Sequence, residues 1–299
     1  MNFGITSIDL EHLIELTKLA SEVSLLEIMS LLNFKNLVKR AYDNGFRVIE
    51  LTLDMAYVIP NSLTEEVAEE LKEIKKKLNL IYTAHLPLWS IEPASPVPHI
   101  RDASVKSLAE IINIAEIFSP EVYVIHATGA LASELSRIEG PPALKNIVNE
   151  MFYSNALKSV ENLLEATGIN SRRLAIENVE FEFKYTRKIV DELDTSICFD
   201  TGHLLAGYSG NYDVMEFLEW NYDKIAEIHL HDGYKIKKNG YVEIKDHIPL
   251  GEGKLPVCEF LTYLDKHNFK GPIIFELQLS WAKQSLDYIK KRCPNIKIE

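Results

Sequence analysis

The chain has 299 residues, 46% of them hydrophobic, so it can bury a large core, and its apolar runs are too short to span a membrane. Its 32 basic and 44 acidic residues give a formal net charge of −12, which weakens a nucleic-acid-binding interpretation without excluding a local basic patch. The N-terminus lacks the pattern of a signal peptide, and three unspaced cysteines do not suggest a secreted disulfide framework. We therefore expect a cytoplasmic protein in which Cys198 and Cys258 are ordinary buried small hydrophobes.

Short apolar segments alternate with segments of helical periodicity along the whole chain. The segments expected to be strands are residues 3–7, 46–53, 80–86, 122–127, 173–178, 195–200, 225–231 and 272–277. The expected helices are residues 33–44, 64–78, 102–118, 144–167, 186–193, 214–220, 255–267 and 281–291. Residues 9–31 also have helical periodicity and make the first connection unusually long, so extra structure is expected over one end of the fold.

The alternation predicts an α/β fold with a closed (β/α)₈ barrel, the TIM barrel architecture. Strands too apolar to face water on either side belong to a parallel sheet covered by helices, and a count of eight favours a closed barrel over an open sheet. We expect one barrel domain over residues 1–299. Two segments interrupt it: residues 87–98 contain four prolines and form an irregular loop, and residues 234–244 alternate around Asn239-Gly240, which predicts an inserted β-hairpin.

Ionisable side chains recur where the expected strands end, on the face that carries the active site in barrels of this kind. They are His85, His126, Glu177, Asp200 with His203, His229 with His231, and Glu276, while His247 lies in the loop before the last strand. So many charged groups at one barrel mouth would be costly without a compensating cation. Mixed imidazole and carboxylate ligands suit Zn²⁺, Mn²⁺, Co²⁺ or Fe²⁺ better than Ca²⁺.

His229 and His231 alternate with Leu230, so both side chains point to the same side of their strand. The second histidine lies about 6–7 Å further along the strand than the first. We therefore favour His229 as a metal ligand and expect His231 to support a ligand or contact the substrate.

These strand-end motifs resemble the xylose isomerase-like barrel superfamily. That group includes sugar and sugar-phosphate isomerases and epimerases, the inosose enzymes, and abasic-site nucleases of the endonuclease IV type. The most specific pieces are Asp200-Thr-Gly-His203 and His247-Ile-Pro-Leu-Gly-Glu-Gly253, and the resemblance extends from about Phe46 to Leu277.

The epimerase branch of that superfamily implies one divalent cation, such as Zn²⁺, Mn²⁺, Co²⁺ or Mg²⁺. The residues that match its ligands are Glu177, Asp200, His229 and Glu276, and the two glutamates would also move the substrate proton through an enediolate. The implied activity is isomerisation or epimerisation of a sugar, a sugar phosphate or a polyol ketone. His203 and His231 would donate hydrogen bonds to substrate oxygens, and Arg101 could pair with a substrate phosphate or simply lie on the surface.

The nuclease branch implies an alternative function, zinc-dependent phosphodiester hydrolysis of abasic DNA, with nucleic acid as the partner. There His85, His126, His203 and His247 would complete a trinuclear zinc cluster together with an aspartate two residues before the last histidine. That position is Lys245 here, and the neighbouring Asp246 is not expected to reach the site, because adjacent residues point in different directions. A non-enzymatic barrel that keeps metal only for structure or regulation is a third alternative. The sequence leaves open whether the chain forms a homo-oligomer.

Overall fold

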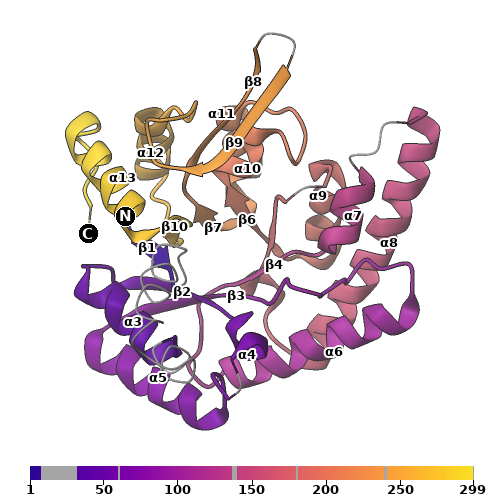
Figure 1. Ribbon diagram of the computed structural model, residues 1–299, viewed down its shortest axis with the longest axis horizontal. Coiled ribbons are helices and arrows are strands. Elements are labelled where there is room, and N and C mark those ends of the chain that lie inside the picture. Colours follow the sequence, from indigo (N-terminus) through magenta and orange to yellow (C-terminus); the bar gives the residue numbers. More distant parts are fainter. Residues whose placement is uncertain (8–31, 60, 137–139, 180, 239–240, 299) are drawn as a thin grey trace, which may run out of the picture.

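The computed structural model describes residues 1–7, 32–59, 61–136, 140–179, 181–238 and 241–298 (Figure 1). The expected helical segment at residues 9–31 lies outside these ranges. The expected turn at Asn239-Gly240 lies outside them too.

A closed parallel barrel forms the centre of the molecule, as the sequence predicts. Its strands are β1 (Phe3–Thr6), β2 (Val48–Thr52), β3 (Ile81–His85), β4 (Tyr123–Ile125), β5 (Leu174–Glu177), β6 (Ser196–Asp200), β7 (Ile225–His229) and β10 (Ile273–Phe275). They pair in the order β1-β10-β7-β6-β5-β4-β3-β2, and β2 pairs with β1 to close the ring. The (β/α)₈ prediction is therefore confirmed.

Amphipathic helices surround this barrel. They are α3 (Phe34–Asp43), α5 (Glu65–Leu78), α6 (Pro98–Ala115), α8 (Pro142–Thr167), α9 (Phe183–Leu193), α11 (Val214–Asn221), α12 (Val257–Lys266) and α13 (Leu279–Arg292). Figure 1 shows α3, α5 and α6 below the strands, α8 and α9 to the right, and α12 and α13 at the upper left. Along the described ranges, none of the helices combines the length and apolar character needed to cross a membrane.

Helix α5 illustrates how local sequence fixes these elements. The Thr64 hydroxyl accepts a hydrogen bond from the Val67 backbone N–H and so caps the first turn. Glu65 and Glu66 lie in that turn and lysines in the last one, which complements the helix dipole. Asn79 ends the helix in a left-handed conformation with φ of 51°.

Three short helices that were not predicted from the sequence lie at the mouth of the barrel, each after a strand. They are α4 (Met55–Val58), α7 (Gly129–Ser136) and α10 (Thr201–Ala206). Each has one or two turns, too few for a hydrophobic period to show in the sequence. Together they shape the rim around the strand ends.

Buried side chains form two separate groups. The larger one lies between strands and helices and contains most of the aromatic core, including Phe118, Phe152 and Phe260. The smaller group is Val122, Val124, Ala175 and Cys198. Strand alternation places this smaller group inside the barrel, on the same side as Glu177 and Asp200 and one layer below them. Small apolar side chains thus fill the barrel beneath the charged layer.

The expected β-hairpin is present and projects beyond the barrel mouth (Figure 1). Its strands β8 (Asp232–Lys238) and β9 (Tyr241–Ile248) form a separate antiparallel sheet and are longer than predicted, so His247 belongs to β9 and not to a loop. Asp232 pairs with Ile248, and Tyr234 pairs with Lys245. Between these two pairs β9 therefore has one residue more than β8. This β-bulge turns the side chains of Asp246 and His247 away from simple alternation.

The interpretation of Cys258 as a free, buried hydrophobe is wrong. Cys258 in α12 forms a disulfide with Cys293 at the end of α13, with Cα atoms 5.2 Å apart. The pairing depends on two helices that pack side by side in the fold, which a separation of 35 residues does not reveal. Cys198 is free and buried, as expected.

Candidate metal centre

Four side chains from consecutive barrel strands meet at the mouth of the barrel. Glu177 ends β5, Asp200 ends β6, His229 ends β7 and Glu276 follows β10, and one ligand atom of each lies within 4.8 Å of the others. His229 Nδ1 lies 3.2 Å from Glu276 Oε2 and 3.8 Å from both Glu177 Oε1 and Asp200 Oδ2. The structure thus brings together the four residues that the sequence predicts as ligands.

The donor atoms of this four-residue cluster suit a divalent cation. Glu177 Oε1, His229 Nδ1 and Glu276 Oε2 are buried and have no hydrogen-bond partner. Burial raises the pKa of the Glu177 carboxyl, but the charges of His126 and His229 outweigh burial and hold that pKa well below its usual range. Three ionised carboxylates this close together need a positive charge among them, and oxygen and imidazole donors are the ligands that Zn²⁺ or Mn²⁺ accept.

Asp200 has a double role that explains its place in the Asp-Thr-Gly-His motif. Its Oδ1 accepts the His203 backbone N–H at 2.6 Å and so caps helix α10. Its Oδ2 accepts a hydrogen bond from His231 Nε2 at 2.9 Å. The cap holds the carboxylate at the strand end with Oδ2 facing the cluster.

His231 supports Asp200 and is unsuited to bind metal. Its Nδ1 accepts the His247 backbone N–H at 2.9 Å, so the ring proton must lie on Nε2, which donates to Asp200. A Cβ at Gly202 would lie 2.1 Å from the His231 ring, so only glycine allows this approach. Although His231 lies close enough to Asp200, His247 and Glu276 to share a cation, both of its nitrogens are already occupied.

A second candidate group consists of His85, His126 and Glu177. Glu177 Oε2 lies 3.0 Å from His126 Nε2 and 3.3 Å from His85 Nε2. His85 Nδ1 lies 3.0 Å from the Leu86 carbonyl and donates to it, so His85 Nε2 faces the carboxylate either as part of an imidazolium or with a cation between them. Burial lowers the pKa of His85, but Glu177 and Glu50 raise it to about 9.

A third candidate group consists of His203, Asp246 and His247, and Asp246 was not expected in it. Asp246 Oδ2 lies 3.1 Å from His247 Nδ1 and 3.8 Å from His203 Nε2. The expectation that Asp246 would not reach the site is wrong, because the bulge in β9 turns this carboxylate inward. Lys245, in the place of the expected aspartate, is exposed on the hairpin instead.

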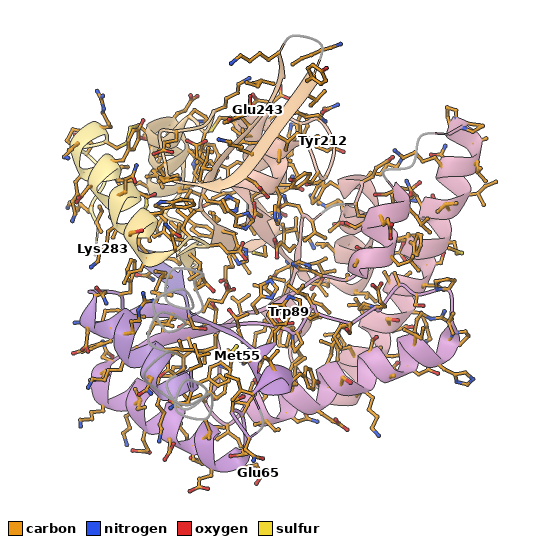
Figure 2. All side chains as sticks on the ribbon, viewed as in Figure 1. Met55, Glu65, Trp89, Tyr212, Glu243 and Lys283 are labelled. Atoms are coloured by element: carbon orange, nitrogen blue, oxygen red, sulfur yellow. A yellow bond between two sulfur atoms is a disulfide. The ribbon has the colours of Figure 1, made fainter. Side chains whose placement is uncertain are left out.

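A cavity of about 720 Å³ opens beside these groups. It is lined by His126, His203 and Asp246 together with Leu88, Gly129, Ala130, Ser133, Glu134, Val179 and Tyr208. Arg101 does not line it, and its guanidinium instead donates to the Ser95 carbonyl at 2.7 Å. Figure 2 shows side chains filling the centre of the ring of strands, whereas the labelled Glu243 lies out on the hairpin.

Two carboxylates deeper in the barrel, Glu50 on β2 and Glu227 on β7, were not predicted as part of the site. Glu50 Oε2 lies 3.1 Å from His229 Nε2, and the Thr83 hydroxyl donates to Glu227 Oε1 at 3.0 Å. Burial and the negative charge of Glu50 raise the pKa of Glu227 well above its usual range. The sequence did offer a signal for Glu227. It stands inside an apolar strand two residues before His229, so its side chain points to the same face of the strand as His229.

Comparison with known protein families identifies the class to which this fold and site belong. A family model described as "Xylose isomerase-like TIM barrel" matches residues 38–292, and the chain belongs to that family. The chain is 26% identical over 202 residues to the uncharacterized protein MJ1614 of Methanocaldococcus jannaschii. The aligned region covers 66% of this chain and 70% of that protein.

Solved structures of similar fold include both enzyme types that the sequence motifs suggest. A D-tagatose 3-epimerase-like protein superposes with a TM-score of 0.68 at 21% identity over 99% of both chains. D-allulose 3-epimerase from Methylomonas sp., in complex with D-allulose, gives 0.66 at 14% identity over 98% of this chain and 97% of that one. Endonuclease IV from Thermus thermophilus gives 0.62 at 15% identity, over 97% of this chain and 98% of that one. At sequence identities this low, the similarity to these structures shows a shared fold and does not show a shared activity.

Proposed function

We propose that the protein is a divalent-metal-dependent isomerase or epimerase of a sugar or sugar phosphate. One observation carries the proposal: Glu177 and Glu276 stand at the two ends of a row of four strand-end ligands, with Asp200 and His229 between them. This arrangement sets two carboxylates around one cation-sized space, as two-base proton transfer requires.

The chemistry assigned to each group follows from its position. A divalent cation held by the four residues would supply Lewis-acid polarisation of a substrate carbonyl and its neighbouring hydroxyl. Glu177 or Glu276 takes the proton from the carbon next to the carbonyl, and the other glutamate returns a proton to the enediolate on the opposite face or the neighbouring carbon. His203 lines the cavity and can donate a hydrogen bond to a substrate oxygen.

The cavity favours a small carbohydrate as substrate. Its volume of about 720 Å³ is in the range of small-molecule sites, and two carboxylates, Glu134 and Asp246, lie in its wall. The formal net charge of −12 disfavours binding to the phosphate backbone of DNA. The D-tagatose and D-allulose in the names of structural neighbours support a ketose. For a sugar phosphate, Arg101 would have to leave the Ser95 carbonyl.

The test is proton exchange in D₂O, followed by NMR, with metal-loaded protein and a panel of ketoses and ketose phosphates. Glu276→Gln should keep bound metal, measured by elemental analysis, but lose exchange by at least about 100-fold, because a general base is removed. Glu259→Gln, an exposed change on α12, serves as the matched control and should exchange like the natural protein. Normal exchange by metal-loaded Glu276→Gln would contradict the two-glutamate mechanism.

The position of Asp246 favours a second candidate function, an endonuclease IV-like phosphodiesterase. With Asp246 turned inward, three neighbouring groups of ligands share the barrel mouth, and Glu177 belongs to two of them. Two or three metal ions together supply an activated water and stabilise a leaving oxygen in such enzymes. One bound metal per chain supports the isomerase, whereas two or three metals and chelator-sensitive incision of an abasic duplex would establish the nuclease.

A further inference from the structure

The imidazole of His229 connects the candidate metal centre to a buried carboxylate on β2, three strands away in the barrel. Its Nδ1 faces Glu177, Asp200 and Glu276, while its Nε2 lies 3.1 Å from Glu50 Oε2. Glu50 reaches this ring from β2, which is separated from β7 by β1 and β10 in the barrel. His229 is fully buried and Glu50 is 1% exposed, so water does not compete for the contact.

We propose that Glu50 is a positioning residue of the metal centre: by accepting the Nε2–H of His229, it keeps the Nδ1 lone pair directed at the metal position. The inference rests on the proposed metal centre and is independent of the proposed reaction. It assigns a role to a residue that lies outside the four-residue cluster.

The hydrogen-bonding capacity of each group decides the direction of this contact. A neutral imidazole carries one N–H, and an ionised carboxylate can only accept hydrogen bonds. In a neutral imidazole that gives its Nε2–H to Glu50 Oε2, Nδ1 keeps a lone pair for a cation, and this atom faces the carboxylates of the cluster without a hydrogen-bond partner. An acceptor on the far nitrogen also makes a metal-binding imidazole more basic and fixes its orientation.

Glu50 is itself held in place inside the barrel. Its carboxyl group lies against that of Glu227, which the Thr83 hydroxyl fixes from β3. Glu227 Oε1 lies 4.0 Å from His229 Nε2, beyond hydrogen-bond distance. The two glutamates therefore share one buried environment, but only Glu50 contacts the imidazole, which makes Glu227 a matched control.

The experiment compares Zn²⁺ affinity, measured by chelator competition, for full-length Glu50→Gln and Glu227→Gln. Both are made in a background with His126→Asn and His247→Asn, which removes a ligand from each of the other groups at the barrel mouth but keeps the four-residue cluster and the deeper group of Glu50, Glu227 and His229. Glu50→Gln should bind Zn²⁺ about 10- to 100-fold more weakly, and Glu227→Gln should bind like the background protein. Equal affinity for all three proteins, or equal loss in both variants, would overturn the role of Glu50.

A measurement on the unsubstituted protein covers the case in which Glu50→Gln does not fold. With ¹¹³Cd²⁺ and ¹⁵N-labelled histidine, NMR should show metal coupling to Nδ1 of His229 and a proton on Nε2. Coupling to Nε2 contradicts the inference, and absence of metal binding by the natural chain overturns both the metal centre and the inference. Metal binding that depends on Glu50 without any proton exchange would reject only the isomerase.

Discussion

At the scale of single residues, the site is defined by which nitrogen of each histidine faces inward. The His247 backbone N–H forces the proton of His231 onto Nε2, and Asp200 receives it. The Leu86 carbonyl takes the Nδ1–H of His85, so that Nε2 faces Glu177. Backbone groups at the strand ends thus orient the imidazoles before any metal binds.

These contacts predict how the stability of the metal-free protein depends on pH. Burial lowers the pKa of His85 and of His203, but neighbouring carboxylates raise each pKa to about 9. A histidine whose pKa is raised on folding stabilises the fold fully below its unfolded value of about 6.5, and that stabilisation is lost as pH rises through about 9. In EDTA, the free energy of unfolding measured in urea should therefore fall between about pH 7 and about pH 9.5.

The variant His203→Asn provides the control for this pH dependence. Without the titrating ring, its stability should fall less steeply over the same interval, although the variant starts from a lower value. A natural protein whose stability rises over that interval would show that these histidines are not charged in the fold.

At the scale of elements, the hairpin decides what the site contains. The extra residue in β9, with His247 at φ of 49°, turns Asp246 into the cavity and leaves Lys245 outside. Strand β8 follows β7 with only Leu230 and His231 between them, so the hairpin is attached directly to the His229 strand. A small irregularity in an inserted hairpin therefore adds a carboxylate to the barrel mouth.

Neighbouring substitutions on β9 test this placement. Asp246→Asn should weaken metal binding at the third group by about 10-fold or more, because a charged ligand is lost, and should lower the number of metals bound per chain if that group is occupied. Lys245→Ala, one residue away on the exposed side, should leave both quantities unchanged. Elemental analysis and competition titration measure them, and the reverse pattern would mean that Lys245 faces the site.

At the scale of the whole molecule, barrel closure brings the candidate ligands together and also places the last helix. Helix α13 follows β10, which pairs with β1 and completes the ring. The disulfide between Cys258 and Cys293 fastens the end of α13 to α12. The C-terminal region is therefore tied covalently to the barrel wall.

Removal of this disulfide should lower global stability. For a loop of 35 residues the chain-entropy relation gives about 4 kcal/mol, so the double variant Cys258→Ser, Cys293→Ser should unfold at lower urea concentration and lower temperature. A reductant should destabilise the natural protein by a similar amount and leave the double variant unchanged. Insensitivity of the natural protein to reductant would mean that the bond does not stabilise the fold.

The sequence by itself determined the barrel and the convergence of the candidate ligands. Apolar segments at regular intervals specify buried parallel strands, and the carboxyl ends of such strands necessarily meet on one face. Glu177, Asp200, His229 and Glu276 end or directly follow their strands, so their convergence follows from topology alone. The period-2 rule likewise predicted that His229 and His231 point to the same side.

Only the tertiary structure decided the rest, because those features depend on contacts between distant segments. The Cys258–Cys293 bond requires the packing of two helices, and the bulge at Asp246 requires the register of two strands. Glu50 meets His229 across the barrel, 179 positions away in the chain. Local periodicity carries no information about contacts over such separations in the chain, so the contact between Glu50 and His229 could be found only from the closed barrel.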